Sequence, residues 1–166
     1  ALRALANSLS TDAHLAVPYQ GQVLYLGREE ASPSSVFPSI VGRLVPAHCT
    51  ALGKVLMAYL SPGERRDFLA GQPLEKRTSK TIITLRRLEV ELGKVVRRGY
   101  AVDHEELYQG LTCVAAPVRD HAGEVVTAIS VSLPRSRMTA ARTERVAHEV
   151  IRTAKIISSG MGYRAA

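Results

Sequence analysis

Two apolar segments joined by a short polar turn restrict the fold of this chain more than any other part of its sequence. Residues 112–118 and 124–133 are largely apolar, and Asp120-His-Ala-Gly123 between them is typical of a hairpin turn. Ser130 and Ser132 alternate with apolar residues, so both hydroxyls point to the same face of the sheet. The hairpin places Cys113 on the strand next to these serines.

Further strands and loops are predicted before this hairpin. Residues 13–17 and 22–26 are predicted short strands, with Tyr19-Gln20-Gly21 as the turn between them. Residues 31–35 have loop composition, and Pro38 and Gly42 keep the following segment irregular or at a sheet edge.

Helix-start signals appear next in the chain. Thr50 can cap a helix over residues 51–59, and Ser61-Pro62-Gly63-Glu64 is a capping-box signature for a short helix that ends near Gly71. The face of the first helix consists of Leu52, Val55, Leu56 and Tyr59.

Two amphipathic helices are predicted around the apolar hairpin. One begins at Thr84 and ends at Gly99, and the other covers residues 139–158. Their predicted buried stripes are Leu85, Leu88, Leu92 and Val95 in the first, and Val146, Val150, Ala154 and Ile157 in the second. The order of strands, helices, strands and helix predicts an α/β or α+β fold with an antiparallel sheet covered by helices.

Composition excludes several classes of protein. The chain has 166 residues, which suits one domain, and 46% hydrophobic with 22% charged residues argues against disorder. The longest apolar stretches reach about half of the roughly 20 residues of a membrane helix, and no secretory signal opens the chain at Ala1. Two cysteines form no disulfide framework, and we expect a reducing cytoplasm and no membrane partner.

Positive charge invites a nucleic-acid interpretation that the aromatic content does not support. The formal net charge is +7, but aromatic residues are 5% and Trp is absent, which weakens any role in base stacking. We therefore expect the basic residues to lie mainly on solvated helix faces.

Known cofactor and metal motifs are incomplete in this sequence. Gly53-Lys54 lacks the glycine five residues earlier and the Ser or Thr that a phosphate-binding loop requires. His104-Glu105-Glu106 has no P-C-x-x-C partner, and His148-Glu149 has no second histidine. We predict no metal and no cofactor.

Two groups of residues leave alternatives open. Cys113 is either a small core residue or a nucleophile, and the two serines either need partners within the core or supply them to a ligand. Free amides after Thr50 either bind a polar ligand atom or form a simply capped helix end.

Five segments in order resemble the effector-binding domain of IclR-type transcriptional regulators, the isocitrate lyase regulator family. They are Val41-Gly42-Arg43 with Pro46, His48-Cys-Thr-Ala-Leu-Gly-Lys54, Thr81-Ile82, Gly99-Tyr-Ala-Val-Asp-His-Glu-Glu106, and Cys113-Val-Ala-Ala-Pro-Val118 through Ile129-Ser-Val-Ser132. The resemblance covers almost the whole chain.

The resemblance implies a fold, an organisation and a function. The fold would be α+β and GAF-like, with a curved antiparallel sheet flanked by helices, as one effector-binding domain over residues 1–166. Residues 1–9 would be the end of a linker helix, and DNA contact would belong to a winged helix-turn-helix that this chain lacks. The chain would form homodimers or homotetramers in a bacterial repressor or activator and would have no catalytic residues.

The resemblance also implies a site for a small organic effector. The matching positions are Ala51, Leu52, Asp103, Cys113, Ser130 and Ser132, with Phe37, Val45 and Leu111 as apolar walls. We expect an organic acid held by backbone amides and the serines, with Asp103 positioning a polar group. No arginine falls at these positions, so a bidentate carboxylate clamp is not evident. Leu133-Pro134-Arg135 departs from the small-residue turn of the family, which affects the rim of the site.

Two other functions are kept as alternatives. One is a dimerisation module without a ligand. The other is an enzyme that uses Cys113 or Cys49 as the nucleophile on a small carbonyl compound.

Overall fold

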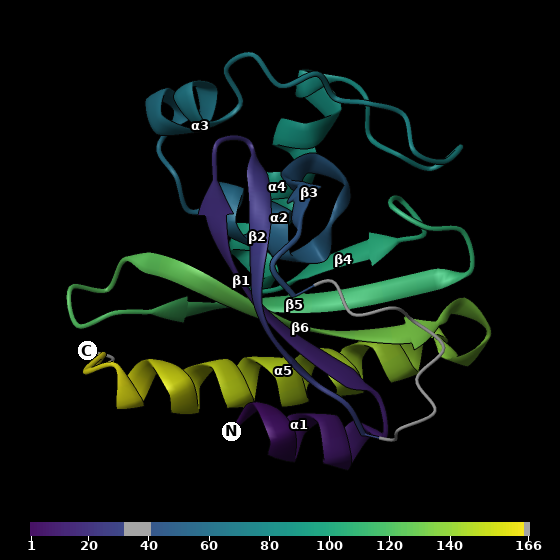
Figure 1. Ribbon diagram of the computed structural model, residues 1–166, viewed down its shortest axis with the longest axis vertical. Coiled ribbons are helices and arrows are strands. Elements are labelled where there is room, and N and C mark those ends of the chain that lie inside the picture. The colour runs from purple at the N-terminus through teal and green to yellow at the C-terminus, as the bar shows by residue number, and fades with distance from the viewer. Residues whose placement is uncertain (32–40, 165–166) are drawn as a thin grey trace.

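A single six-stranded antiparallel sheet organises the molecule (Figure 1). The computed structural model describes residues 1–31 and 41–164. The strand order is β3-β2-β1-β6-β5-β4. The strands are β1 (Asp12–Tyr19), β2 (Gln22–Glu29), β3 (Leu44–Pro46), β4 (Ala101–His104), β5 (Leu111–Arg119) and β6 (Val125–Pro134).

The predicted hairpins are confirmed, and they meet in the centre of the sheet. In the turn between β5 and β6, a carboxylate oxygen of Asp120 accepts hydrogen bonds from the amides of Ala122 and Glu124, at 2.9 and 3.0 Å. Gln20 and Gly21 turn the chain between β1 and β2 with φ of 44° and 75°. Antiparallel pairing of β1 with β6 then joins the two hairpins into one sheet.

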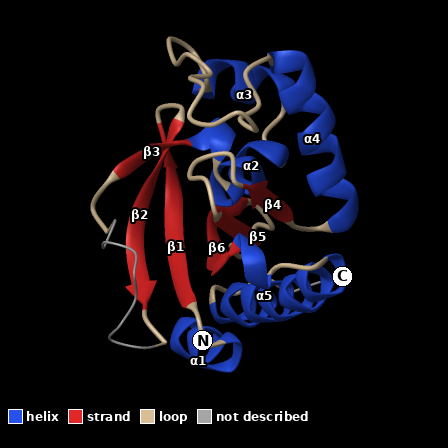
Figure 2. Ribbon diagram, turned by 90° about the vertical axis from the view of Figure 1, so that its right-hand side faces the viewer, coloured by secondary structure: helices blue, strands red, loops and turns tan. Residues whose placement is uncertain are grey.

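Helices cover both faces of this sheet (Figure 2). On one face, α1 (Leu2–Leu9) and α5 (Ala140–Gly160) pack against the side of β6 that carries Ile129, Val131 and Leu133. On the other face, α2 (Ala51–Ala58) and α4 (Leu85–Arg98) form the second core. The connecting elements are α3 (Pro62–Phe68), η1 (Ala47–Cys49) and η2 (Arg135–Arg137).

The predicted helix caps are confirmed. The hydroxyls of Thr50, Ser61, Thr84 and Thr139 each accept a hydrogen bond from an amide in the first turn of their helix, and Ser61 with Glu64 completes the capping box. Gly99 ends α4 in the left-handed conformation. None of the helices among residues 1–31 and 41–164 is both long and apolar enough to cross a membrane.

Burial extends beyond the predicted face of α2 and falls short of the predicted stripe of α4. All eight residues of α2 are buried, not one stripe, because the helix lies between the sheet and α4. Leu85 is 60% exposed, since it lies in the first turn of α4 and borders a surface hollow with Leu69 and Ile83. Leu88, Leu92 and Val95 are buried as predicted, whereas Ile157 at the end of the α5 stripe is only partly buried. Pro38 and residues 32–35 lie outside the described residues.

Candidate functional site

The register of the sheet aligns four chemically active side chains in one row on the face that α2 covers. Asp103 of β4 pairs with Cys113 of β5, which pairs with Ser132 of β6, which pairs with Asp12 of β1. Directly opposite residues in antiparallel strands have Cβ atoms about 5 Å apart. The thiol of Cys113 lies 3.3 Å from the hydroxyl of Ser132. The predicted neighbourhood of Cys113 and Ser132 is therefore present.

A second row lies beside the first and contains Ser130. It runs through Ala101, Ala115, Ser130, His14 and Arg28. The alanines belong to the core cluster that includes Ala51 and Leu52, so the small side chains of β4 and β5 accommodate the start of α2. The polar members of this row are Ser130 on β6, His14 on β1 and Arg28 on β2.

The start of α2 is held in place by a close backbone contact. Thr50 Oγ1 accepts the amide of Gly53 at 3.0 Å, and the first helical hydrogen bond runs from Lys54 N to Thr50 O. The amides of Ala51 and Leu52 precede that bond. A Cβ on Gly53 would lie 2.2 Å from the carbonyl oxygen of Ala47, so only glycine allows η1 to approach α2 this closely.

Asp103 lies at the end of the site nearest to a buried ion pair. Its Oδ1 accepts the amide of Glu106 at 2.6 Å, and burial raises the pKa of its carboxyl to about 7. Lys54 Nζ is fully buried, donates to the carbonyl of Val102 at 2.6 Å and pairs with the carboxylate of Glu106. The ammonium of Lys54 opposes the rise of the Asp103 pKa, but desolvation is the larger effect. This ion pair ties α2 to the segment that carries Asp103.

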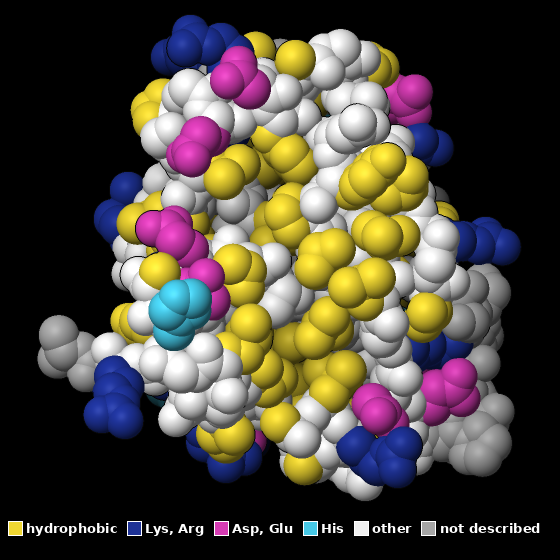
Figure 3. Space-filling model, turned by 60° about the vertical axis from the view of Figure 1, so that its left-hand side comes forward, with side chains coloured by type: hydrophobic (Ala, Val, Ile, Leu, Met, Phe, Trp, Pro, Cys, Tyr) yellow, Lys and Arg dark blue, Asp and Glu magenta, His cyan; other side chains and the backbone are white. Residues whose placement is uncertain are grey.

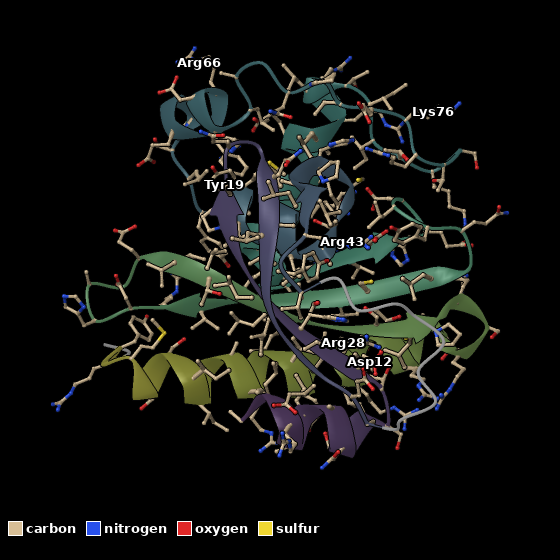
Figure 4. All side chains as sticks on the ribbon, viewed as in Figure 1. Asp12, Tyr19, Arg28, Arg43, Arg66 and Lys76 are labelled. Carbon is tan, nitrogen blue, oxygen red and sulfur yellow. The ribbon has the colours of Figure 1, made fainter. Side chains whose placement is uncertain are left out.

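β1 and β2 bring charged and polar side chains to the site that sequence reasoning missed. Arg28 pairs with Asp12 at 2.8 Å and with Glu30 at 3.2 Å, and the side chains of Arg28 and Asp12 are only 6% and 8% exposed. Figure 4 shows Asp12 and Arg28 next to each other at the lower end of the hairpin. His14 lies between Ser130 and Arg28 in the second row. Alternation along β1 puts Asp12 and His14 on one face, but a bulge after Leu15 shifts the pairing with β2, so the sequence alone did not indicate Arg28.

The apolar residues predicted for the site are placed at different distances from it. Leu111 shares the face of Cys113 and pairs with Pro134 in the next row. Val45 pairs with Val23 of β2, and this pair lies two side-chain rows from His14 along the β1–β2 hairpin. Both valines belong to the core cluster that contains Ala51 and Leu52. Phe37 lies outside the described residues.

The two thiols are not poised as nucleophiles. Burial raises the pKa of Cys49 to about 12 and raises the pKa of Cys113 as well, with the Asp103 carboxylate as a further cause at both. A thiol is nucleophilic mainly as the thiolate, so these surroundings do not favour the cysteine-dependent enzyme. Among the described residues, no group of three or more His, Cys, Asp or Glu side chains is arranged to hold a metal ion.

Fold and site together define a class of protein: an α+β, GAF-like domain with a curved sheet and polar groups gathered on one covered face. Residues 1–159 match the family model for the "Bacterial transcriptional regulator IclR C-terminal". The chain belongs to this family, as the five sequence segments indicated.

Curated and solved relatives agree with this assignment. The chain is 31% identical over 162 residues to the HTH-type transcriptional regulator KdgR of Escherichia coli K12, covering 98% of this chain and 62% of KdgR. It is 34% identical over 165 residues to BhcR of Paracoccus denitrificans, covering 98% and 58% of the two chains. The crystal structure of the C-terminal domain of E. coli KdgR superposes with a TM-score of 0.89 at 30% identity, covering 98% and 94%. The chain thus spans about three fifths of the length of these curated relatives.

Proposed function

We propose that this chain is the effector-binding, oligomerising part of an IclR-type transcriptional regulator that acts in the cytoplasm. A small organic acid binds on the face of the sheet under α2 and changes DNA binding by a winged helix-turn-helix of the complete protein. The observation that carries the proposal is the pair of adjacent rows that gather polar side chains, most of them buried, from five strands on one face. Related proteins named as transcriptional regulators support the regulatory role.

Each proposed site residue has a chemical role in this proposal. The hydroxyls of Ser130 and Ser132 and the thiol of Cys113 supply hydrogen bonds, and the amides of Ala51 and Leu52 face the carboxylate of the effector. Val45, Leu111 and Phe37 supply apolar walls. Residues 1–166 form one effector-binding domain, with α1 as the end of the linker helix.

The raised pKa of Asp103 removes a conflict between an aspartate and an anionic effector. A carboxyl with a pKa of about 7 carries a proton in roughly half of the molecules at neutral pH. In the protonated form it donates a hydrogen bond to an effector oxygen and repels no negative charge. Asp103 therefore positions a polar group of the acid.

The proposal can be tested by a thermal-shift screen of this chain. The compounds are keto acids, hydroxy acids, aromatic acids, lactones and sugars. An effector at 100 times its dissociation constant stabilises the folded state by about 2.7 kcal/mol, a shift of several degrees. We expect the shift to decrease in Ser130→Ala and Ser132→Ala and to persist in Ser159→Ala, which changes an exposed serine of α5. An unchanged shift in both site variants would contradict the assignment. No shift with any compound would favour the dimerisation module without a ligand.

Catalysis and direct DNA binding are not part of the proposed function of this chain. The chain catalyses no reaction, so iodoacetamide should label neither cysteine rapidly in the folded state. DNA contact belongs to the winged helix-turn-helix, so this chain alone should show no DNA binding that weakens steeply with salt. Rapid stoichiometric labelling, or salt-dependent DNA binding, would count against these two statements respectively.

We propose that copies of the chain associate as a homodimer or homotetramer. In support, the side of the β1–β2 hairpin that faces away from α2 carries half-buried Leu15, Val17 and Leu24, and Leu26 is 52% exposed. Figure 3 shows apolar side chains gathered in a band across this side of the molecule. Contiguous exposed apolar surface of this kind marks contact sites between proteins.

A further inference from the structure

His14 is a buried side chain whose position makes it a neighbour of the proposed effector. It lies on β1 directly opposite Ser130 of β6 and opposite Arg28 of β2, on the face that α2 covers. The residue is 6% exposed, and its ring meets the ring of Tyr25 edge-on, with centroids 5.7 Å apart. The aromatic contact holds the orientation of the imidazole but satisfies neither ring nitrogen.

Neither nitrogen of His14 has a hydrogen-bond partner within the described part of the chain. Nδ1 is fully enclosed and unpaired. The charged neighbours Asp12 and Arg28 pair with each other at 2.8 Å. About nine in ten buried polar atoms in native proteins are hydrogen-bonded, because an unpaired buried polar atom loses its bonds to water without replacement. A core histidine kept for packing alone would carry this cost without compensation.

The surroundings define which kind of partner the imidazole accepts. Burial lowers the pKa of His14 to about 4, and the Asp12 carboxylate opposes this shift while the Arg28 guanidinium adds to it. The ring is therefore uncharged near neutral pH, with one nitrogen that donates and one that accepts. A hydroxyl can bond to either nitrogen and a carbonyl oxygen can accept from one, whereas a carboxylate gains no charge pairing from a neutral ring.

We propose that His14 determines the specificity of the site by hydrogen-bonding a hydroxyl or carbonyl oxygen that the effector carries in addition to its carboxylate. This inference rests on the proposed function, since it concerns the same face of the sheet. It narrows the effector from organic acids in general to hydroxy acids and oxo acids. Ser130, opposite His14, lies beside the same oxygen of the effector.

Two variants separate this role from a structural one. His14→Leu removes both nitrogens with an apolar side chain of similar size, and His14→Gln keeps one donor and one acceptor. Thr112→Val is the matched control, because Thr112 Oγ1 is also buried and unpaired, but Thr112 alternates with Cys113 and faces α5. Both His14→Leu and Thr112→Val remove an unpaired buried polar atom, and only the first of them does so in the site.

The first measurement needs no effector. We expect His14→Leu and Thr112→Val in the free chain to unfold at the same temperature as wild type or higher, because each removes a polar atom that has no partner. An unfolding midpoint several degrees lower in His14→Leu than in wild type and Thr112→Val would show that the nitrogens of His14 are already satisfied in the free protein. That result would overturn the inference whether or not the site binds an acid.

The second measurement uses propionate, L-lactate and pyruvate, which share a three-carbon acid and differ only at the second carbon. Wild type and Thr112→Val should bind lactate or pyruvate more tightly than propionate. The ratio of these affinities should fall about tenfold in His14→Leu, and His14→Gln should restore part of it. A preference that survives in His14→Leu overturns the inference and leaves the proposed function intact. If wild type binds none of the three acids, this result counts against the proposed function for small acids. The unfolding midpoints of the variants then decide the inference about His14 by themselves.

Discussion

Gly53 shows how one missing side chain positions the candidate site. Its α2 backbone approaches η1 so closely that a Cβ would meet three backbone atoms of Ala47 between 2.2 and 2.6 Å away. Backbone atoms cannot rotate away from such a contact, so the whole start of α2 would have to move. The amides of Ala51 and Leu52 would move with it.

Gly53→Ala should therefore destabilise the fold and disturb the site together. We expect a loss of about 1–3 kcal/mol or more in the free energy of unfolding, even though alanine favours helices over glycine. Chemical denaturation measures this loss. Gly93→Ala in α4 is the control, because the nearest atom to its added Cβ is the end of the Arg97 side chain at 3.6 Å, and it should be neutral or stabilising. A Gly53→Ala variant as stable as wild type would contradict the close contact.

Asp103 should give the chain a pH-dependent stability between about pH 4 and pH 7. Its pKa is about 7 in the folded state and close to 3.8 when unfolded, so the folded state holds the proton more tightly. The stability from this group is full below the unfolded pKa and is lost as pH rises through the folded pKa, by no more than about 4 kcal/mol. Asp103→Asn should lack this loss, as measured by urea unfolding at several pH values.

The control for Asp103 is an exposed aspartate of the same chain. The free energy of unfolding of Asp67→Asn in α3 should differ from that of wild type by a nearly constant amount over the same range of pH. A wild-type profile that runs parallel to that of Asp103→Asn would show that burial does not shift the titration of Asp103.

At the scale of elements, α4 shows that the apolar periodicity of a helix and the burial of its residues can differ. Leu85 and Leu88 are both apolar and lie three residues apart, and the sequence placed them in one buried stripe. The structure exposes 60% of Leu85 and 1% of Leu88. Periodicity predicts which side of a helix faces the core, but not where along its length the core ends.

Alanine substitutions in α4 should follow burial and not periodicity. Leu88→Ala should cost about 2–5 kcal/mol, because it leaves a cavity between α4 and α2, whereas Leu85→Ala should change stability by less than about 0.5 kcal/mol. Thermal or chemical unfolding of the two variants measures the difference. Equal losses would mean that the first turn of α4 packs in the core.

The strands were predictable because alternation, turn chemistry and short loops all agreed. Hairpins over residues 13–26 and 112–133 are present, and Cys113 and Ser132 are paired neighbours. The short strands β3 and β4 have little pattern of their own and take their extended form from pairing at the two edges of the sheet. Three- and four-residue strands are too short for a periodic signal.

At the scale of the whole molecule, self-association should depend on the apolar side of the β1–β2 hairpin. Leu26→Asp should shift the chain toward monomer in sedimentation or light-scattering measurements, because a charge in an apolar interface loses hydration without a partner. Leu85→Asp changes a leucine of α4 that is 60% exposed, and it should leave the oligomeric state unchanged. A wild-type chain that is monomeric at all concentrations would contradict the proposed association.

The sequence by itself determined the class of fold, the helix caps, the two hairpins and the family, because these depend on local patterns and on residues close together in the chain. Through the resemblance to the family it also predicted Asp103, Cys113, Ser130 and Ser132 as site residues, and these lie in two adjacent rows of one face. Only the tertiary structure decided that β1 and β2 add His14, Asp12 and Arg28 to those rows. The pairing of β1 with β6 joins segments more than one hundred residues apart, and a bulge sets the register of β2, so no local pattern could predict either contact.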